Sequence, residues 1–228
     1  MHIRAVIFDL DNTLLDFMKM KDAAIRSAVD AMVEAGLTID KDEAVDAVKN
    51  IYDAKGYEYQ EVFNEFLRHQ MGKVDYKYLA SAIVAYRRAK EASLMLYPHV
   101  NMTLMTLAKM GLKLGVVSDA PSREAWMRLC YLNLHHLFDA VVTFEDTGMH
   151  KPSPEPFDKI CNLLEIKPEE ALMVGDWPER DMVGAKQVGM TTAFARYGDT
   201  LGIEESGADY DLTDICQLID IVRGQKRV

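Results

Sequence analysis

Apolar residues along this chain follow two different periodicities. Residues 3–8 form a short apolar run that stops at Asp9, and comparable runs cover residues 112–117, 140–144, 171–174 and 190–195. A short run that is apolar on both faces is typical of a strand buried in a parallel sheet. Between about residues 17 and 95 the apolar positions recur at helical spacing instead, which predicts a set of amphipathic helices with no strand between them.

The order of these segments predicts the fold class. Helical patterns over about 100–110, 122–133, 154–164, 179–188 and 214–223 alternate with the predicted strands. Such alternation favours an α/β protein with a doubly wound parallel sheet. We therefore predict a Rossmann-like core domain made of residues 1–16 and 97–228, with an α-helical bundle domain inserted as residues 17–96.

Composition narrows the class of function. The 228 residues carry a formal net charge of −10, so the basic footprint of a nucleic-acid-binding protein is missing. No stretch approaches the ~20 apolar residues that a membrane-spanning helix needs, and the N-terminal apolar run is interrupted at once by an aspartate. The three cysteines are widely spaced and predict no disulfide or metal framework. We expect a cytoplasmic protein that binds neither nucleic acid nor membrane.

Chemically active side chains gather where the predicted strands end. In open α/β sheets, ligands bind beyond the carboxyl ends of the strands, so these positions deserve inspection. The residues there are Asp9, Asp11, Thr13, Ser118, Asp119, Lys151, Asp176 and Asp181. Taken singly, an Asp-x-Asp pair is typical of a solvated turn and Ser118 of a helix cap. Their joint occurrence along one sheet edge favours a site.

The acidic part of this set needs a compensating charge. Two carboxylates ~4 Å apart repel by about 4 kcal/mol at an effective dielectric constant of ~20. Asp9 and Asp11 leave the strand on the same side, and Asp176 adds a third carboxylate. Oxygen ligands without histidine or cysteine favour Mg²⁺. Lys151 and the hydroxyl of Ser118 could then hold phosphoryl oxygens.

The residues also resemble a known family, the haloacid dehalogenase-like hydrolases. Asp9-Leu10-Asp11-Asn12-Thr13 resembles its first motif, DxDx[TV], and Ser118 its second. Lys151, in Lys-Pro-Ser-Pro-Glu-Pro-Phe, resembles the third motif. Gly175-Asp176 with Asp181 resembles the fourth, and the order of the motifs holds across the whole chain. The helical insertion after the first motif is similar to the first cap type of this family.

This resemblance implies a Mg²⁺-dependent phosphatase acting on a small phosphate ester. Asp9 would attack phosphorus and form an aspartyl phosphate, while Asp11 would protonate the leaving oxygen and then activate water. Mg²⁺ would be held by the carboxylates of Asp9 and Asp176 and the backbone carbonyl of Asp11. Ser118 and Lys151 would bind phosphoryl oxygens, and Asp181 and Thr13 would support the site. The helical cap would read the rest of the substrate.

Several alternatives remain open. Similar enzymes that remove halide lack an acid at the position of Asp11, so this residue favours phosphate esters over haloacids. A phosphomutase of the same family is a second alternative. A phosphoryl-accepting signalling or binding module is a third, disfavoured by the long helical insertion. Asp119 departs from the family pattern, in which asparagine or a small residue is common. The sequence names neither the metabolite nor the oligomeric state.

Overall fold

The computed structural model describes residues 3–224, and these fall into two compact units. Unit 1 takes its residues from Met1–Asp16 and Met95–Val228, and unit 2 is Phe17–Leu94. The sequence analysis placed the second boundary after residue 96. The structure places it after Leu94, because Asp16 donates its N–H to the carbonyl of Met95 at 3.2 Å and Leu96 forms a β-bridge with Leu15, which ties both residues to unit 1.

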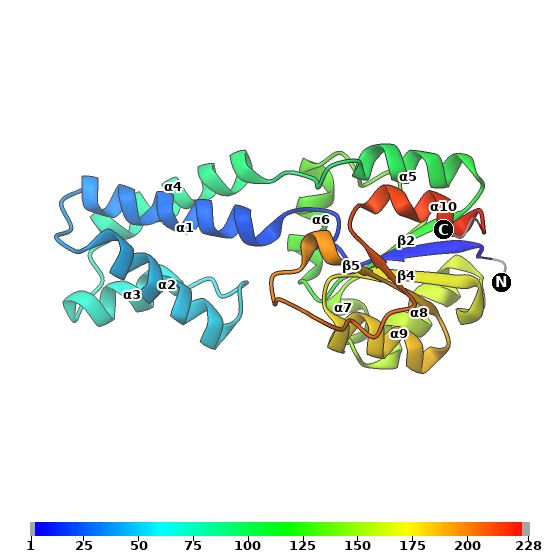
Figure 1. The fold of residues 1–228 in the computed structure, drawn as a ribbon. Coiled ribbons are helices and arrows are strands. Elements are labelled where there is room, and N and C mark those ends of the chain that lie inside the picture. The colour runs from blue at the N-terminus through cyan, green and yellow to red at the C-terminus, as the bar shows by residue number, and fades with distance from the viewer. Residues whose placement is uncertain (1–2, 225–228) are drawn as a thin grey trace. The chain divides into compact units, whose positions relative to one another are not determined.

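Unit 1 is built on a parallel sheet (Figure 1). Within residues 3–224 the sheet has six strands in the order β3-β2-β1-β4-β5-β6, and every neighbouring pair is parallel. The strands are β1 (Ala5–Phe8), β2 (Lys113–Val117), β3 (Ala140–Val142), β4 (Ala171–Gly175), β5 (Thr191–Ala195) and β6 (Tyr210–Leu212). β1 is fully buried, as its unbroken apolar run predicts. The register brings Phe8 opposite both Val116 and Val174, so these three strands end at one level.

Helices cover both faces of this sheet (Figure 1). The helices of unit 1 are α5 (Val100–Lys109), α6 (Ser122–Tyr131), α7 (Phe144–Thr147), α8 (Pro154–Leu164), α9 (Val183–Val188) and α10 (Leu218–Val222). α8 and α9 lie on one face, where Phe157 and Ile160 pack with Ala5 and Ile7 of β1. α5 and α10 lie on the other face. Short helical turns complete the unit: η1 (Pro168–Glu170), η2 (Pro178–Met182), η3 (Arg196–Gly198) and η4 (Ile215–Gln217).

The structure corrects the sequence prediction at several element ends. The strand predicted over 140–144 stops at Val142, because Thr143 caps α7: its N–H and its hydroxyl both donate to Asp146 Oδ2 at 2.8 Å. The helix predicted over 179–188 divides into the π-helical turn η2 and α9. The helix predicted over 214–223 divides into η4 and α10. The apolar pattern does not predict β6, a three-residue edge strand that begins with the exposed Tyr210.

Unit 2 is a bundle of helices around its own core (Figure 1). Its helices, within residues 17–94, are α1 (Phe17–Glu34), α2 (Lys41–Lys55), α3 (Val62–Met71) and α4 (Tyr76–Ser93). Asp40 begins α2 by accepting the N–H groups of Asp42 and Glu43, each at 3.0 Å. The core includes Val29, Val48, Phe66 and Leu67. The apolar stripes therefore pack against one another within the unit.

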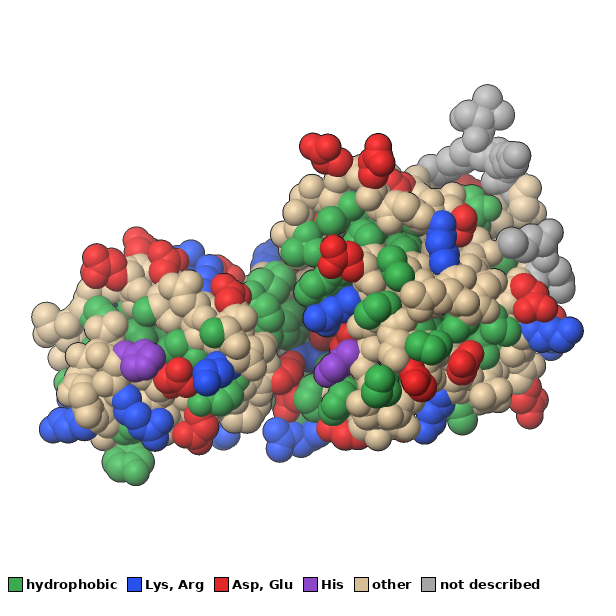
Figure 2. Space-filling model, turned by 90° about the horizontal axis from the view of Figure 1, so that it is seen from below, with side chains coloured by type: hydrophobic (Ala, Val, Ile, Leu, Met, Phe, Trp, Pro, Cys, Tyr) green, Lys and Arg blue, Asp and Glu red, His purple; other side chains and the backbone are tan. Residues whose placement is uncertain are grey.

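The surface carries both signs of charge. Acidic and basic side chains are interspersed over the face of the protein drawn in Figure 2, with apolar side chains between them. This agrees with a net charge that is negative but modest for 228 residues. Among the helices of residues 3–224, none has the length and apolar character that a membrane crossing requires.

Candidate active site

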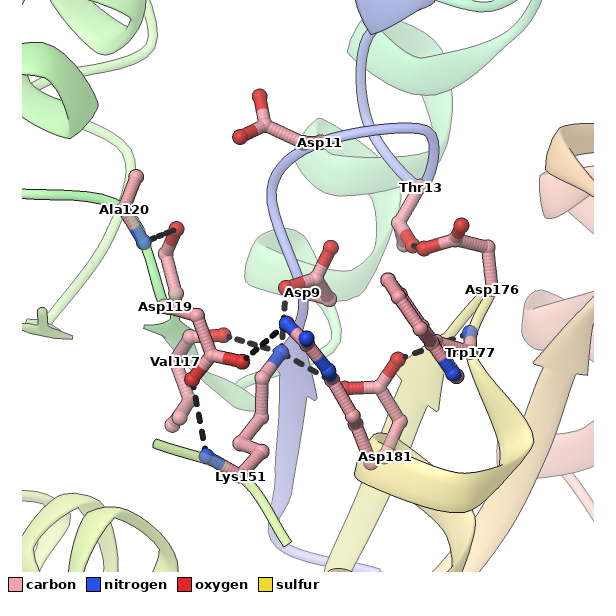
Figure 3. A network of polar contacts seen from close by, with 12 residues as sticks. Asp9, Asp11, Thr13, Val117, Asp119, Ala120, Lys151, Asp176, Trp177 and Asp181 are labelled. Carbon is pink, nitrogen blue, oxygen red and sulfur yellow. Dashed lines mark hydrogen bonds and ion pairs between the residues drawn. The ribbon is translucent and has the colours of Figure 1, made fainter. Parts of the chain in front are cut away.

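The polar residues of the site follow three central strands at one edge of the sheet. Asp9 follows β1, Ser118 follows β2 and Asp176 follows β4, and all three residues are buried. The backbone keeps the sheet pairing up to this edge, since Asp9 N–H donates to Val174 O at 2.8 Å. The parallel register therefore brings together residues far apart in sequence (Figure 3).

Lys151 lies at the centre of a group of buried charged residues, the lysine cluster, which includes Asp9, Asp176 and Asp181. Its ammonium contacts Oδ1 of Asp9, lies 2.7 Å from Oδ1 of Asp181 and donates to Val117 O at 3.1 Å. The side chain of Lys151 is only 3% exposed, and those of Asp9 and Asp181 are 10% and 1% exposed. A buried ammonium is costly unless it is paired, so these contacts keep Lys151 charged in this position.

The pKa values of the buried carboxyls are raised, first by burial and then by the neighbouring carboxylates, which outnumber the lysine. Burial raises the pKa of Asp9 well above its ordinary value; Lys151 opposes this shift, whereas Asp181 and Asp176 add to it. Burial and Asp181 likewise raise the pKa of Asp176 to about 7, against the opposing effects of Lys151 and Thr13. Burial lowers the pKa of Lys151, but the carboxylates of Asp181, Asp9 and Asp119 outweigh it, so that pKa is raised. The cluster is short of positive charge.

Gly175 makes room for one of these carboxylates. A Cβ atom at this position would lie 2.2 Å from Oδ2 and 2.3 Å from Cγ of Asp181. The same oxygen, Asp181 Oδ2, accepts the backbone N–H of Trp177 at 3.1 Å. The glycine of the Gly175-Asp176 pair is thus required by close packing, because a side chain there would displace Asp181 from Lys151.

Thr13 supports Asp176 from the loop after β1. Its hydroxyl donates to Oδ1 of Asp176 at 3.2 Å, and its side chain is fully buried. The hydroxyl of Tyr197, on η3, donates to Thr13 O at 2.8 Å and fixes the backbone of this loop. Tyr197 was not predicted as part of the site, because a tyrosine beyond the last motif carries no signal of such a contact.

Asp119 has a structural role that the sequence analysis could not assign. Its Oδ1 accepts the backbone N–H of Lys151 at 2.9 Å, and its Oδ2 accepts from the guanidinium of Arg180 at 3.1 Å. That guanidinium stacks 3.9 Å from the ring of Trp177. The negative charge of Asp119 is therefore partly compensated by Arg180, and its carboxylate fixes the backbone at Lys151.

Asp11 and Ser118 lie at the same edge but bond to other partners. Nη1 of Arg128, on α6, donates to Oδ2 of Asp11 at 2.8 Å. The side chain of Asp11 is directed away from Asp9 (Figure 3). The hydroxyl of Ser118 accepts the N–H of Ala120 at 3.2 Å. Arg128 was missed by the sequence analysis, because an arginine inside an amphipathic helix is ordinarily interpreted as part of a solvated face.

The donor set at this edge fits a hard divalent cation. Asp9 and Asp176 offer carboxylate oxygens, and Asp11 follows Asp9 by two residues with its backbone carbonyl. Raised pKa values at both carboxyls show that the cluster favours additional positive charge, from protons or from a metal. Oxygen donors without nitrogen or sulfur are those that Mg²⁺ prefers. These residues could therefore hold Mg²⁺.

Comparisons with known proteins find relatives over nearly the whole chain. The family model described as haloacid dehalogenase-like hydrolase matches residues 6–195. The chain is 37% identical over 226 residues to the glyceraldehyde 3-phosphate phosphatase of Methanocaldococcus jannaschii, covering 99% of both chains. It is 37% identical to the enzyme of the same name from Methanopyrus kandleri, covering 97% of both chains.

A solved structure has a similar fold. The HAD phosphatase from Thermococcus onnurineus is 28% identical, with a TM-score of 0.71, and the match covers 99% of this chain and 100% of that one. The predicted family resemblance and the predicted α/β fold class are therefore confirmed.

Proposed function

Because the chain belongs to the haloacid dehalogenase-like hydrolase family and is a phosphoric monoester hydrolase, we propose that it dephosphorylates a small sugar phosphate through a phosphorylated Asp9. One observation carries the proposal: Asp9 ends the central strand β1, buried, with the ammonium of Lys151 against one of its oxygens. A carboxylate held at such a point can serve as a nucleophile, since it divides hydrolysis into two easier steps.

Two residues would bind the phosphoryl group beside Asp9. Lys151 supplies a buried positive charge, and Ser118 supplies a hydroxyl from the end of β2. Both would stabilise the charge that develops on the equatorial oxygens during transfer. Lys151 would exchange part of its contact with Asp9 for the phosphoryl oxygen, while its contact with Asp181 keeps it in place.

Mg²⁺ would be bound by the carboxylates of Asp9 and Asp176 and by the backbone carbonyl of Asp11. When bound, the cation supplies the charge neutralisation that phosphate needs to approach this acidic cluster. Thr13 supports the proposed ligand Asp176, with which it shares a hydrogen bond of 3.2 Å. Asp181 acts through Lys151, which its Oδ1 approaches to 2.7 Å.

Asp11 would act as the general acid and then as the general base. It would give a proton to the bridging oxygen as the phosphorus–oxygen bond of the ester breaks, and later take a proton from the attacking water. An acid is needed for an alcohol leaving group and not for a halide, so Asp11 supports phosphate-ester hydrolysis over dehalogenation.

We further propose a triose phosphate as the substrate class. Two relatives that match at least 97% of this chain are named for glyceraldehyde 3-phosphate. Unit 2 is proposed as the cap that selects the part of the substrate beyond the phosphate.

Phosphate release from glyceraldehyde 3-phosphate, with Mg²⁺ and with EDTA, tests this function. Asp9→Asn keeps the size of the side chain but removes the nucleophile, so we expect turnover to fall by at least about 10³-fold. Asp30→Asn serves as the matched control, because Asp30 pairs with Lys41 on the surface of unit 2 and activity should stay unchanged. Full activity of Asp9→Asn, or no hydrolysis of any phosphate ester by the wild type, would refute the proposal.

A further inference from the structure

Arg128 is a charged side chain in an unusually buried place. It lies on α6, only 2% of its side chain is exposed, and it ranks with Phe8 and Phe66 among the largest fully buried residues of the described chain. Burying a guanidinium is unfavourable unless it is paired. Its contacts therefore indicate what this arginine does.

One of those contacts is with Asp11. Nη1 of Arg128 donates to Oδ2 of Asp11 at 2.8 Å, joining α6 to the loop after β1 across 117 residues of sequence. The two partners differ in exposure, since 23% of the Asp11 side chain is exposed against 2% for Arg128. The guanidinium is thus a fixed buried anchor, and the aspartate is the partner closer to solvent.

Asp11 lies two residues from Asp9, yet its side chain takes no part in the lysine cluster. Figure 3 shows its carboxylate directed away from Asp9, whereas Asp9 faces Lys151. Charge-assisted hydrogen bonds with arginine are directional, so the bond to Oδ2 restricts the rotation of the aspartate side chain. The same guanidinium therefore fixes the position of the second oxygen, Oδ1, which is buried in the structure.

We propose that Arg128 is the positioning residue of Asp11: it holds Oδ2 and so presents Oδ1 for proton transfer. This inference rests on the proposed function. In the first step, Oδ1 gives its proton to the bridging oxygen while the phosphorus–oxygen bond breaks and Asp9 bonds to phosphorus. In the second step, water attacks phosphorus and gives a proton to Oδ1, the bond to Asp9 breaks, and inorganic phosphate leaves.

A residue that positions a general acid has a characteristic effect on leaving groups. An alkoxide leaves poorly without a proton, whereas p-nitrophenolate is stable as an anion and leaves without one. Since kcat/KM covers the steps up to alcohol release, comparing two esters by this constant isolates the first proton transfer. A general loss of folding or of phosphate binding would lower kcat/KM equally for both esters.

The experiment compares glyceraldehyde 3-phosphate with p-nitrophenyl phosphate in wild type, Arg128→Met and Arg128→Lys. We expect Arg128→Met to lower kcat/KM by about 10²-fold for the sugar phosphate and by less than about threefold for the aryl phosphate. Lysine keeps the charge but not the planar fork, so Arg128→Lys should show a smaller split, of about tenfold.

Arg123→Met is the matched control on the same helix. Arg123 is 73% exposed and pairs with Glu124 at 3.0 Å, so its removal should leave both constants unchanged. If Arg128→Met does not fold, Arg128→Lys carries the test, together with the double variant Asp11→Asn/Arg128→Lys. In the Asp11→Asn background the arginine substitution should cause no further split between the esters.

The outcomes separate the two proposals. A parallel loss on both esters, a loss confined to KM, or no loss in either arginine variant overturns the role of Arg128 while phosphatase activity stands. A further split in the Asp11→Asn background also overturns it, because Arg128 would then act without Asp11. No turnover of either ester by the wild type would instead overturn the proposed function.

Discussion

Each unit of this protein buries a lysine, and the two lysines have different surroundings. Lys151 in unit 1 contacts the carboxylates of Asp9 and Asp181. Lys21 in unit 2 is 3% exposed; it donates to the carbonyl of Tyr57 and, at 2.7 Å, to the hydroxyl of Tyr86. Its ammonium also lies 4.2 Å from the centre of the Tyr52 ring. Lys151 thus contacts charged groups, whereas these contacts of Lys21 are with two dipoles and a ring face.

This difference distinguishes a functional site from a structural contact. The carboxylates around Lys151 exceed its charge, and the pKa values of Asp9 and Asp176 are raised, first by burial and then by neighbouring carboxylates, so negative charge is unfavourable here. Such a surplus is relieved by a cation and is a frequent property of functional sites. The carbonyl of Tyr57, the hydroxyl of Tyr86 and the ring of Tyr52 are uncharged, so these contacts add no negative charge around Lys21. Burial of a charged group alone therefore does not identify a site.

Removal of Lys151 should have the largest effect. We expect Lys151→Met to lower kcat by about 10²–10³-fold, because a donor to the phosphoryl oxygens is lost. The variant should also lose about 3–5 kcal/mol of unfolding free energy in EDTA, because Asp9 and Asp181 are left buried without their partner. Phosphate release and chemical denaturation measure the two effects.

Lys186→Met is the control for this prediction. Lys186 is 42% exposed and pairs with Asp209 at 3.5 Å, so its loss should change stability by less than about 1 kcal/mol and leave kcat unchanged. If Lys151→Met kept the wild-type kcat, Lys151 could no longer be distinguished from Lys21 as a functional residue.

The sequence was sufficient to predict most of this cluster. Asp9, Ser118 and Asp176 could be placed together because each follows an apolar run, and parallel strands end at one edge. Arg128 and Arg180 could not be found in this way, because the sequence around each is an ordinary helix or turn and their partners lie 117 and 61 residues away. β6 was missed because only its last residue, Leu212, is buried. Its pairing with β5 is decided by tertiary contact, which local pattern does not encode.

Magnesium should stabilise unit 1 in a pH-dependent way. Asp176 keeps its proton up to about pH 7 in the folded protein, against an ordinary pKa of 3.8. The folded state thus binds more protons than the unfolded chain between these values, so rising pH destabilises the metal-free protein in this window. Mg²⁺ must displace that proton. We expect the rise in Tm caused by Mg²⁺ to increase as the pH approaches about 7 and to level off above it.

Thermal unfolding with Mg²⁺ and with EDTA, from about pH 5 to about pH 8, measures this effect. Asp176→Asn should show a smaller Mg²⁺ effect with a weaker dependence on pH, because only one of the two carboxyls with a raised pKa then remains. A constant rise in Tm across the whole range in the wild type would contradict the surplus of negative charge at this cluster.

Replacement of Lys21 should have the smallest effect, and an effect on stability alone. Lys21→Met fills similar space but removes the donor to Tyr57 O and Tyr86 Oη, so we expect a loss of about 1–2 kcal/mol of unfolding free energy. The kcat should stay within about threefold of wild type, since the carbonyl and the hydroxyl that accept from Lys21 take no part in the proposed chemistry. Lys49→Met is the control in unit 2, because Lys49 is 37% exposed and pairs with Asp22 at 2.5 Å. A loss of more than about tenfold in kcat with unchanged stability would contradict this prediction. Lys21 would then have a functional role despite its contacts with dipoles and a ring face, and surplus charge would no longer distinguish the two lysines.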